Sequence, residues 1–170
     1  MNSHIRTLSA TAIGLAAALA FGFPPWAIAG DLPQSGTFKV HSGWKGAGEV
    51  VQVEKNHVFN AGHVFGVIFN DAGSGPLHNG AVVCSYILDL MNGAGPAQGL
   101  CAWSDSDGDK IFTSYTGNLA ASGAFPGMNQ ITGGTGKFAG IKGKAPFQCI
   151  SLNDKFQVAC TQQFEYSLTK

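Results

Sequence analysis

The amino-acid sequence predicts an all-β fold, and three observations support this. Short runs rich in β-branched and aromatic residues recur along the chain, separated by turn residues at spacings of about 8–12 residues. Signals for helices are almost absent. Apolar and polar residues alternate in the C-terminal hairpin, which is the period of a strand with one buried face. Together these observations favour a barrel or a sandwich of about eight or nine strands.

The expected strands lie between turns that glycine, proline, asparagine and aspartate mark. Their ranges are 37–41, 49–53, 62–69, 81–90, 99–103, 110–116, 128–132, 147–152 and 157–168. The glycine-rich stretch 42–48 is expected to be a loop between the first two strands. Asp107-Gly108 is a strong signal for a two-residue hairpin turn, and it sets the alignment expected for the strands beside it.

The N-terminus, residues 1–29, has the layout of a secretory signal peptide. Residues 1–6 carry a single arginine and no acid, residues 7–23 are uncharged and largely apolar, and Pro24-Pro25 ends any helix there. The pattern Ala27-Ile28-Ala29 matches an A-x-A cleavage site, so we expect cleavage after it and a secreted or periplasmic protein. A retained membrane anchor is the alternative, but the apolar run is near the lower length limit for spanning a bilayer.

The remainder of the chain, residues 30–170, is expected to form one domain. Of the ten lysines and arginines one is Arg6, which leaves nine lysines against ten acidic residues in this domain. A domain with this balance and no arginine lacks the basic surface that nucleic-acid binding needs. No segment after Phe23 is long and apolar enough to cross a membrane as a helix. We expect no cofactor.

The four cysteines of the chain all lie in the expected domain. An even number indicates disulfides in an exported protein. Two independent hairpins each bring one pair of cysteines opposite each other, so we expect the disulfides Cys84–Cys101 and Cys149–Cys160. A redox pair or a metal site is the alternative, but no C-x-x-C spacing supports it.

The alternation of side chains also indicates which residues face the interior. In the C-terminal hairpin the inward set is apolar except for Gln162, whose buried amide needs a partner in a neighbour or in a ligand. The apolar members are Ala145, Phe147, Cys149, Val158, Cys160, Phe164 and Tyr166. The same hairpin alignment places Tyr86, Cys101, Trp103, Phe112 and Ser114 on one face. An aromatic set with a few polar ends suits a lined pocket, and ordinary core packing is the alternative.

The most distinctive stretch runs from Gly133 to Gly143 and has five glycines among its eleven residues. We expect a tight, irregular connection between two strands there. Ile131-Thr132-Gly133-Gly134-Thr135-Gly136-Lys137-Phe138, with Gly117, Gly123, Phe125, Gly127 and Gly143, resembles the G-G-T-G-x-F turn of the dirigent and allene oxide cyclase-like superfamily. The resemblance implies a single closed antiparallel β-barrel of eight strands. Members are often oligomeric and bind apolar molecules inside, and some of them steer cyclisation or radical coupling. A homo-oligomer is therefore possible here.

Three further polar features of the sequence bear on possible sites. Residues 105–109 resemble the start of a calcium loop but lack the glycine and the glutamate that an EF-hand requires, so we expect a turn. The histidines have no metal-binding spacing, and no metal is expected. Glu49, His57 and His78 are candidates to meet at one mouth of the barrel and to act as acid and base. Solvated or structural roles are the alternative for each.

The leading functional hypothesis is an exported, disulfide-stapled β-barrel that binds a small apolar molecule. The residues expected to line its pocket are Tyr86, Trp103, Phe112, Phe147, Gln162 and Tyr166. One alternative is an isomerase or cyclase of the same barrel type, in which Glu49 or His57 polarises the substrate. Another alternative is an envelope interaction protein whose barrel is filled.

Overall fold

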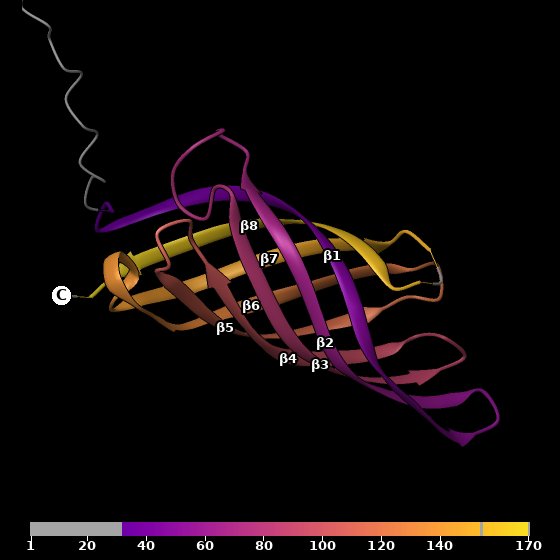
Figure 1. Ribbon diagram of the computed structural model, residues 1–170. Coiled ribbons are helices and arrows are strands. Elements are labelled where there is room, and N and C mark those ends of the chain that lie inside the picture. Colours follow the sequence, from indigo (N-terminus) through magenta and orange to yellow (C-terminus); the bar gives the residue numbers. More distant parts are fainter. Residues whose placement is uncertain (1–31, 154, 170) are drawn as a thin grey trace, which may run out of the picture. The chain divides into compact units, whose positions relative to one another are not determined.

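Eight strands pair in their sequence order, each antiparallel to the next, and β1 also pairs with β8 (Figure 1). The structure, a computed structural model, describes residues 32–153 and 155–169, so the predicted signal peptide 1–29 lies outside the described residues. The strands are β1 (Ser35–Glu54), β2 (His57–Asn70), β3 (Gly80–Met91), β4 (Gly95–Ser104), β5 (Lys110–Leu119), β6 (Ala124–Gly134), β7 (Ile141–Ser151) and β8 (Gln157–Leu168). A 3₁₀ helix, η1 (Gly136–Phe138), lies within the glycine-rich connection of β6 to β7. The expected closed antiparallel barrel is confirmed.

The first strand is longer than the sequence predicted. Residues 37–41 and 49–53 belong to one continuous strand, β1, and the loop expected at 42–48 is wrong. The glycines in this stretch allow close contacts: a Cβ at Gly46 would collide with the ring of Phe156, and a Cβ at Gly48 would collide with the hydroxyl of Tyr86. Glycine inside a strand is typical of such close approaches. The partners are remote in sequence, so the glycines alone suggested a loop.

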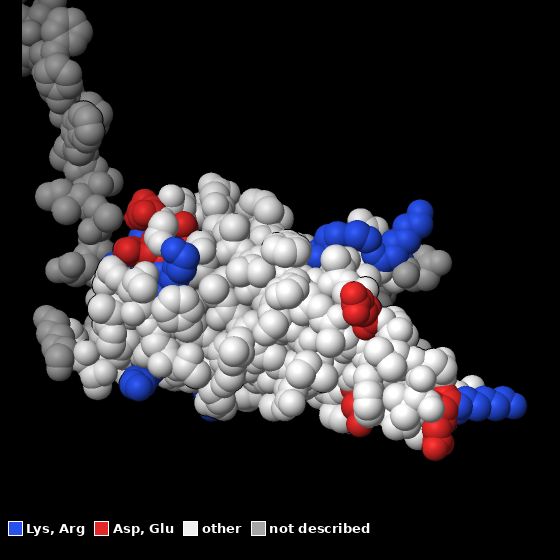
Figure 2. Space-filling model, turned by 60° about the horizontal axis from the view of Figure 1, so that its bottom comes forward, with Lys and Arg blue, Asp and Glu red and all other residues white. Residues whose placement is uncertain are grey.

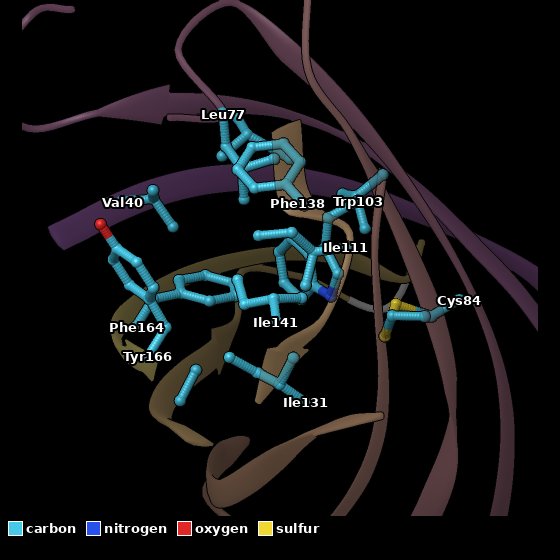
Figure 3. Packing of buried hydrophobic residues seen from close by; sticks show 14 of the residues in the cluster. Val40, Leu77, Cys84, Trp103, Ile111, Ile131, Phe138, Ile141, Phe164 and Tyr166 are labelled. Carbon is cyan, nitrogen blue, oxygen red and sulfur yellow. A yellow bond between two sulfur atoms is a disulfide. The ribbon is translucent and has the colours of Figure 1, made fainter. Parts of the chain in front are cut away.

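Apolar side chains close one end of the barrel. Leu77, from the connection between β2 and β3, and Phe138, from η1, are fully buried and belong to one cluster with Ile111 and Trp103 (Figure 3). The turns β1–β2, β3–β4, β5–β6 and β7–β8 lie at the opposite end (Figure 1). The two ends of the interior therefore differ, because two fully buried side chains from connections, Leu77 and Phe138, fill the closed end.

Both expected disulfides are confirmed. Cys84 lies directly opposite Cys101 in the pairing of β3 with β4, and Cys149 lies opposite Cys160 in the pairing of β7 with β8. Closing loops of this size stabilises the fold by about 3 kcal/mol each in the chain-entropy account. Disulfides persist in oxidising compartments, so the two bridges suggest an extracellular or periplasmic environment.

The glycine-rich connection after β6 is held by the loop between β4 and β5. Nζ of Lys137 lies 3.2 Å from Oδ1 of Asp105 and 2.6 Å from Oδ2 of Asp107. The backbone N–H of Leu77 donates to Asp105 at 3.2 Å, and that of Lys137 donates to Asp109 at 3.0 Å. These contacts occupy the carboxylates of the calcium-like sequence. Within residues 32–153 and 155–169, no group of three or more His, Cys, Asp or Glu side chains is arranged to hold a metal ion.

The outer surface is apolar on one side of the barrel. Exposed apolar side chains gather on the outward side of β2–β5 and are called the outer apolar face: Phe65, Val67, Val83, Ile87, Leu100 and Phe112. Phe65, Val83 and Phe112 lie in one row that crosses four strands. In the view of Figure 2, charged side chains lie mainly toward the two ends and the middle is largely uncharged. The described residues contain no helix of the length and apolarity that a membrane span requires.

The carboxylate of Asp105 stabilises the closed end in its charged form. Burial acts to raise the pKa of this carboxyl, but hydrogen bonds from the Asp107 N–H, the Lys137 ammonium and the Leu77 N–H outweigh burial and lower the pKa. A carboxyl whose pKa is lower in the folded state adds stability above its ordinary pKa of about 3.9. That stability is lost as the pH falls through the lowered value.

We expect Asp105→Asn to lower the free energy of unfolding at pH 7 by about 2–3 kcal/mol. This is less than the roughly 3–5 kcal/mol found for fully buried pairs, because the Lys137 side chain is 22% exposed. Urea unfolding at neutral pH and below about pH 4 measures the effect, and the variant should lose less stability on acidification than the wild type. The control Asp89→Asn removes an exposed pair with His57 and should cost less than about 1 kcal/mol. Equal losses in both variants would contradict the assignment.

Candidate functional site

An apolar cavity lies inside the barrel toward the end opposite η1, and all eight strands contribute to its wall. Its volume is about 100 Å³ for the centres of water-sized molecules, and about 730 Å³ when all space between its wall atoms and in its open mouth is counted. The lining residues are Trp44, Val64, Cys84, Tyr86, Leu88, Cys101, Trp103, Tyr115, Leu119, Phe125, Asn129, Phe147, Cys149, Ser151, Phe156, Val158, Cys160 and Gln162. Most of this surface is aromatic, aliphatic or disulfide.

Aromatic rings from different strands form the wall through edge-to-face contacts. Tyr86 meets Phe156 with ring centroids 5.1 Å apart, and Phe147 meets Phe125 at 5.2 Å and Tyr115 at 6.0 Å. Such arrangements stabilise aromatic pairs beyond their burial. Phe156 comes from the β7–β8 turn, and its backbone C=O accepts the N–H of Gly46 at 2.9 Å. The turn is thereby fixed against β1 at the rim of the cavity.

Four of the six residues expected to line a pocket do line the cavity: Tyr86, Trp103, Phe147 and Gln162. Tyr166 is buried on the inner face as expected, but it does not line the cavity. It belongs to the same core cluster as Phe164 (Figure 3), and its ring centroid lies 6.0 Å from that of Phe38. It lies in the row of Gly36 and Gly143, close to the closed end.

Phe112 was expected to face inward, and this is wrong. Its side chain is 37% exposed, whereas both of its sequence neighbours are buried. The expectation assumed a two-residue turn at Asp107-Gly108, which would pair Trp103 with Phe112. In the structure Trp103 pairs with Ile111, because the connection spans residues 105–109. A shift of one residue moves every side chain of a strand to the other face.

Glu49, His57 and His78 do not meet. Glu49 is exposed near the β1–β2 turn, and Nε2 of His57 lies 2.6 Å from the exposed carboxylate of Asp89. His78 lies in the connection between β2 and β3, at the other end of the barrel. None of the three lines the cavity. The expectation of one shared mouth is wrong, because alternate residues of a strand face opposite sides and because His57 begins β2 whereas His78 lies in the connection that follows β2, at the other end of the barrel.

A hydrogen-bonded relay links the adjacent strands β4, β5 and β6 on the inner face. Nε1 of Trp103 donates to Oγ1 of Thr113 at 2.9 Å, and Oγ1 of Thr113 donates to Oδ1 of Asn129 at 2.9 Å. All three side chains are almost completely buried. Trp103 and Asn129 both line the cavity. The sequence did not indicate Thr113, because the expected two-residue turn placed it on the outer face. The alternation of the strand around Ile131 would have placed Asn129 on the inner face, since Asn129 and Ile131 are two residues apart.

A second relay joins β1 to β8. Nε1 of Trp44 donates to Oγ of Ser42 at 2.7 Å, and Oγ of Ser42 donates to Oε1 of Gln162 at 3.5 Å. Trp44 and Gln162 line the cavity. The sequence predicted that the buried amide of Gln162 needs a partner, and Ser42 is one such partner. The sequence did not indicate Ser42 as this partner, because residues 42–48 were expected to form a loop.

Tyr86 and Tyr115 line the cavity, and the hydroxyl group of each is hydrogen-bonded to a neighbouring protein group. Oη of Tyr86 donates to Oδ1 of Asn60 at 3.1 Å, and Oη of Tyr115 donates to the backbone O of Ser85 at 3.4 Å. Desolvation by burial raises the pKa of both phenols, and the neighbouring Tyr86 raises the pKa of Tyr115 further. Both phenols are therefore neutral at physiological pH. Across the part of the chain that the structure describes, the lining includes no carboxylate and no imidazole.

The fold and this cavity define a closed antiparallel β-barrel with an apolar interior site. Comparison with protein-family models gives no match, and neither curated proteins nor solved structures match the chain. The resemblance to the dirigent and allene oxide cyclase-like superfamily therefore stays a prediction from the sequence motif around Gly133–Phe138.

Burial raises the pKa of all three tyrosines of the chain, Tyr86, Tyr115 and Tyr166. We expect tyrosinate absorbance to appear in the native protein only above pH 10, and near pH 10 in guanidinium, because the ordinary pKa of tyrosine is about 10. The unfolded state ionises first, so stability falls as the pH rises above about 10. Spectrophotometric titration of native and unfolded protein measures this. Coincident titration curves would show that the phenols are not buried.

Proposed function

We propose that this protein binds a small apolar molecule inside the barrel. The observation that carries the proposal is the open-mouthed cavity lined by aromatic side chains and two disulfides. Ligand sites are typically concave, mostly apolar and equipped with a few polar groups. An apolar cavity of about 150 Å³ admits benzene in another protein. The corresponding volume here is about 100 Å³, so a ligand of that size would extend into the open mouth. The resemblance to barrel families that bind apolar molecules supports the same conclusion.

Binding is favoured over isomerase or cyclase chemistry. A catalyst that moves a proton needs a group of suitable pKa within hydrogen-bond reach of the substrate. Along the described lining the titratable groups are phenols, whose pKa values burial raises. Glu49 and His57, the residues expected to act on a substrate, point away from the cavity. A binding protein needs no such group.

We also propose that the protein is exported. The sequence of residues 1–29 has the layout of a signal peptide. The two disulfides suit a periplasmic or extracellular space, where the barrel would meet apolar molecules that need a carrier or a receptor.

The fluorescent apolar probe N-phenyl-1-naphthylamine tests the binding proposal. We expect its fluorescence to rise on titration with the protein. Ser151→Trp should lower the affinity at least about tenfold, because Ser151 lines the cavity at its exposed rim and an indole there blocks the mouth. The matched control Ser35→Trp places the same side chain at the exposed start of β1 and should leave the affinity unchanged. Equal binding by both variants would place the probe outside the cavity, and no binding by the wild type would refute the proposal.

A second candidate function, that of an interaction protein, is favoured by the outer apolar face. Large exposed apolar patches mark interaction sites. We propose a second copy of this chain as the partner. The outward side chains of β3 and β4 include a single charged residue, Asp89, at the open end. Two such faces can therefore meet without placing like charges opposite each other.

Leu100→Ser tests the self-association, because Leu100 is 63% exposed within the outer apolar face. We expect sedimentation velocity at micromolar concentration to show a dimer for the wild type and a monomer for this variant. Leu152→Ser is the matched control, since Leu152 is 61% exposed but lies beyond the end of β7. A wild-type monomer, or equal behaviour of the two variants, would contradict an interface at this face.

A further inference from the structure

We propose that the ligand of the cavity carries a neutral carbonyl oxygen, and that the side-chain amide N–H groups of Asn129 and Gln162 bind it. This inference rests on the proposed binding function and names the chemical class of the ligand. It follows from the direction of the two interior relays, which leaves amide donors facing the cavity.

The relay through Thr113 orients the amide of Asn129. An indole N–H can only donate, so Oγ1 of Thr113 accepts from Trp103 and its own hydrogen needs a separate acceptor. Oδ1 of Asn129, at 2.9 Å, is that acceptor. The reversed amide would leave the hydroxyl hydrogen of Thr113 without a partner at a position that is 1% exposed, and an unpaired buried donor is costly. The NH₂ group of Asn129 therefore points away from the relay.

The relay through Ser42 orients the side-chain amide of Gln162 in the same way, with its oxygen toward the hydroxyl. Oγ of Ser42 accepts from the indole of Trp44 at 2.7 Å, and its hydrogen is directed to Oε1 of Gln162 at 3.5 Å. This second bond is longer, so it orients the amide less firmly than the bond to Asn129 does. The NH₂ group of Gln162 is again the free end.

Neither NH₂ group donates to a protein group within residues 32–153 and 155–169. Both residues are buried, with exposures of 2% for Asn129 and 5% for Gln162. Among the described residues, Nδ1 of His78 is the one side-chain nitrogen or oxygen atom that lacks both a hydrogen-bond partner and accessible surface. The two amide nitrogens therefore keep some accessible surface. Both residues line the cavity, and the proposal places that surface there.

The surroundings of these donors select the kind of acceptor. A pure hydrocarbon in the cavity would leave the N–H groups dry and unpaired. A carboxylate would pair with them, but the described lining has no lysine or arginine to balance its charge, and burying an unpaired charge is costly. A carbonyl oxygen accepts hydrogen bonds and brings neither a charge nor a donor that needs its own partner. A ketone, ester or similar neutral carbonyl on an apolar body fits these conditions.

Three ligands of nearly the same shape separate the possibilities: acetophenone, ethylbenzene and benzoate. Each is titrated against the bound N-phenyl-1-naphthylamine probe on the wild-type protein. We expect acetophenone to displace the probe at about tenfold lower concentration than ethylbenzene, because it satisfies a donor that ethylbenzene buries unpaired. Benzoate should be weaker than acetophenone. The infrared C=O stretch of bound acetophenone should lie below its value in hexane, as expected for a hydrogen-bonded carbonyl.

Two nearly isosteric variants locate the donors. Gln162→Met and Asn129→Leu should each reduce the preference for acetophenone over ethylbenzene, while ethylbenzene itself still binds. The matched controls Gln148→Met and Asn118→Leu change exposed residues on the outer side of β7 and β5 and should keep the preference. If a cavity variant fails to fold, the wild-type ligand series and the infrared shift still decide the chemical class.

The outcomes distinguish this inference from the proposed function. Ethylbenzene and acetophenone displacing the probe equally well would refute the carbonyl and leave apolar binding intact. Tightest binding by benzoate would refute a neutral head group. A preference for acetophenone that both cavity variants retain would refute the assignment to Asn129 and Gln162. Failure of the wild type to bind the probe or any of the three ligands would refute the binding function itself.

Discussion

Pairing of β1 with β8 is the constraint on which the rest of the structure depends. It closes the sheet, so that every strand has two neighbours and no edge is left to pair with another chain. Closure also divides each strand into residues that face the axis and residues that face outward. The core, the cavity and the outer apolar face all follow from this division, because each is built from one set of alternate residues.

The two ends of the interior differ because different kinds of side chains enter them. At the closed end, Leu77 and Phe138 reach inward from connections and complete the packing of the core. At the open end, the inner positions of β1 include Gly46 and Gly48, and aromatic rings from other elements pack against these glycines. Rings of fixed shape fill this space incompletely, which leaves an apolar cavity bounded by Tyr86, Phe156 and their neighbours.

The polar groups of the interior are few, and each has a defined hydrogen-bonding role. In both relays an indole N–H donates to a hydroxyl oxygen, and the hydroxyl hydrogen is then donated to an amide oxygen. Buried polar groups must be paired to be tolerated, so the relays account for the hydroxyls of Thr113 and Ser42. The relays use the amide oxygens of Asn129 and Gln162, so the amide nitrogens of these residues are the polar groups available to a ligand. The same chains that stabilise the core thereby give the cavity a chemical preference.

By itself the sequence determined the all-β class, both disulfides and the inward face of the C-terminal hairpin. These features are local, since alternation within a strand and symmetry about a short turn follow from neighbouring residues. Tertiary structure alone decided that β1 continues through Gly46 and Gly48. The rings of Phe156 and Tyr86 occupy the space that a Cβ at these positions would take, and both lie far along the chain. The tertiary structure also decided the outward face of Phe112, since residues 105–109 form a longer loop that holds Lys137 of a distant connection. The relay to Gln162 joins β1 to β8, and only closure of the barrel brings Ser42 within hydrogen-bonding distance of that amide. The relay to Asn129 links the consecutive strands β4, β5 and β6, and the register of their pairing sets it.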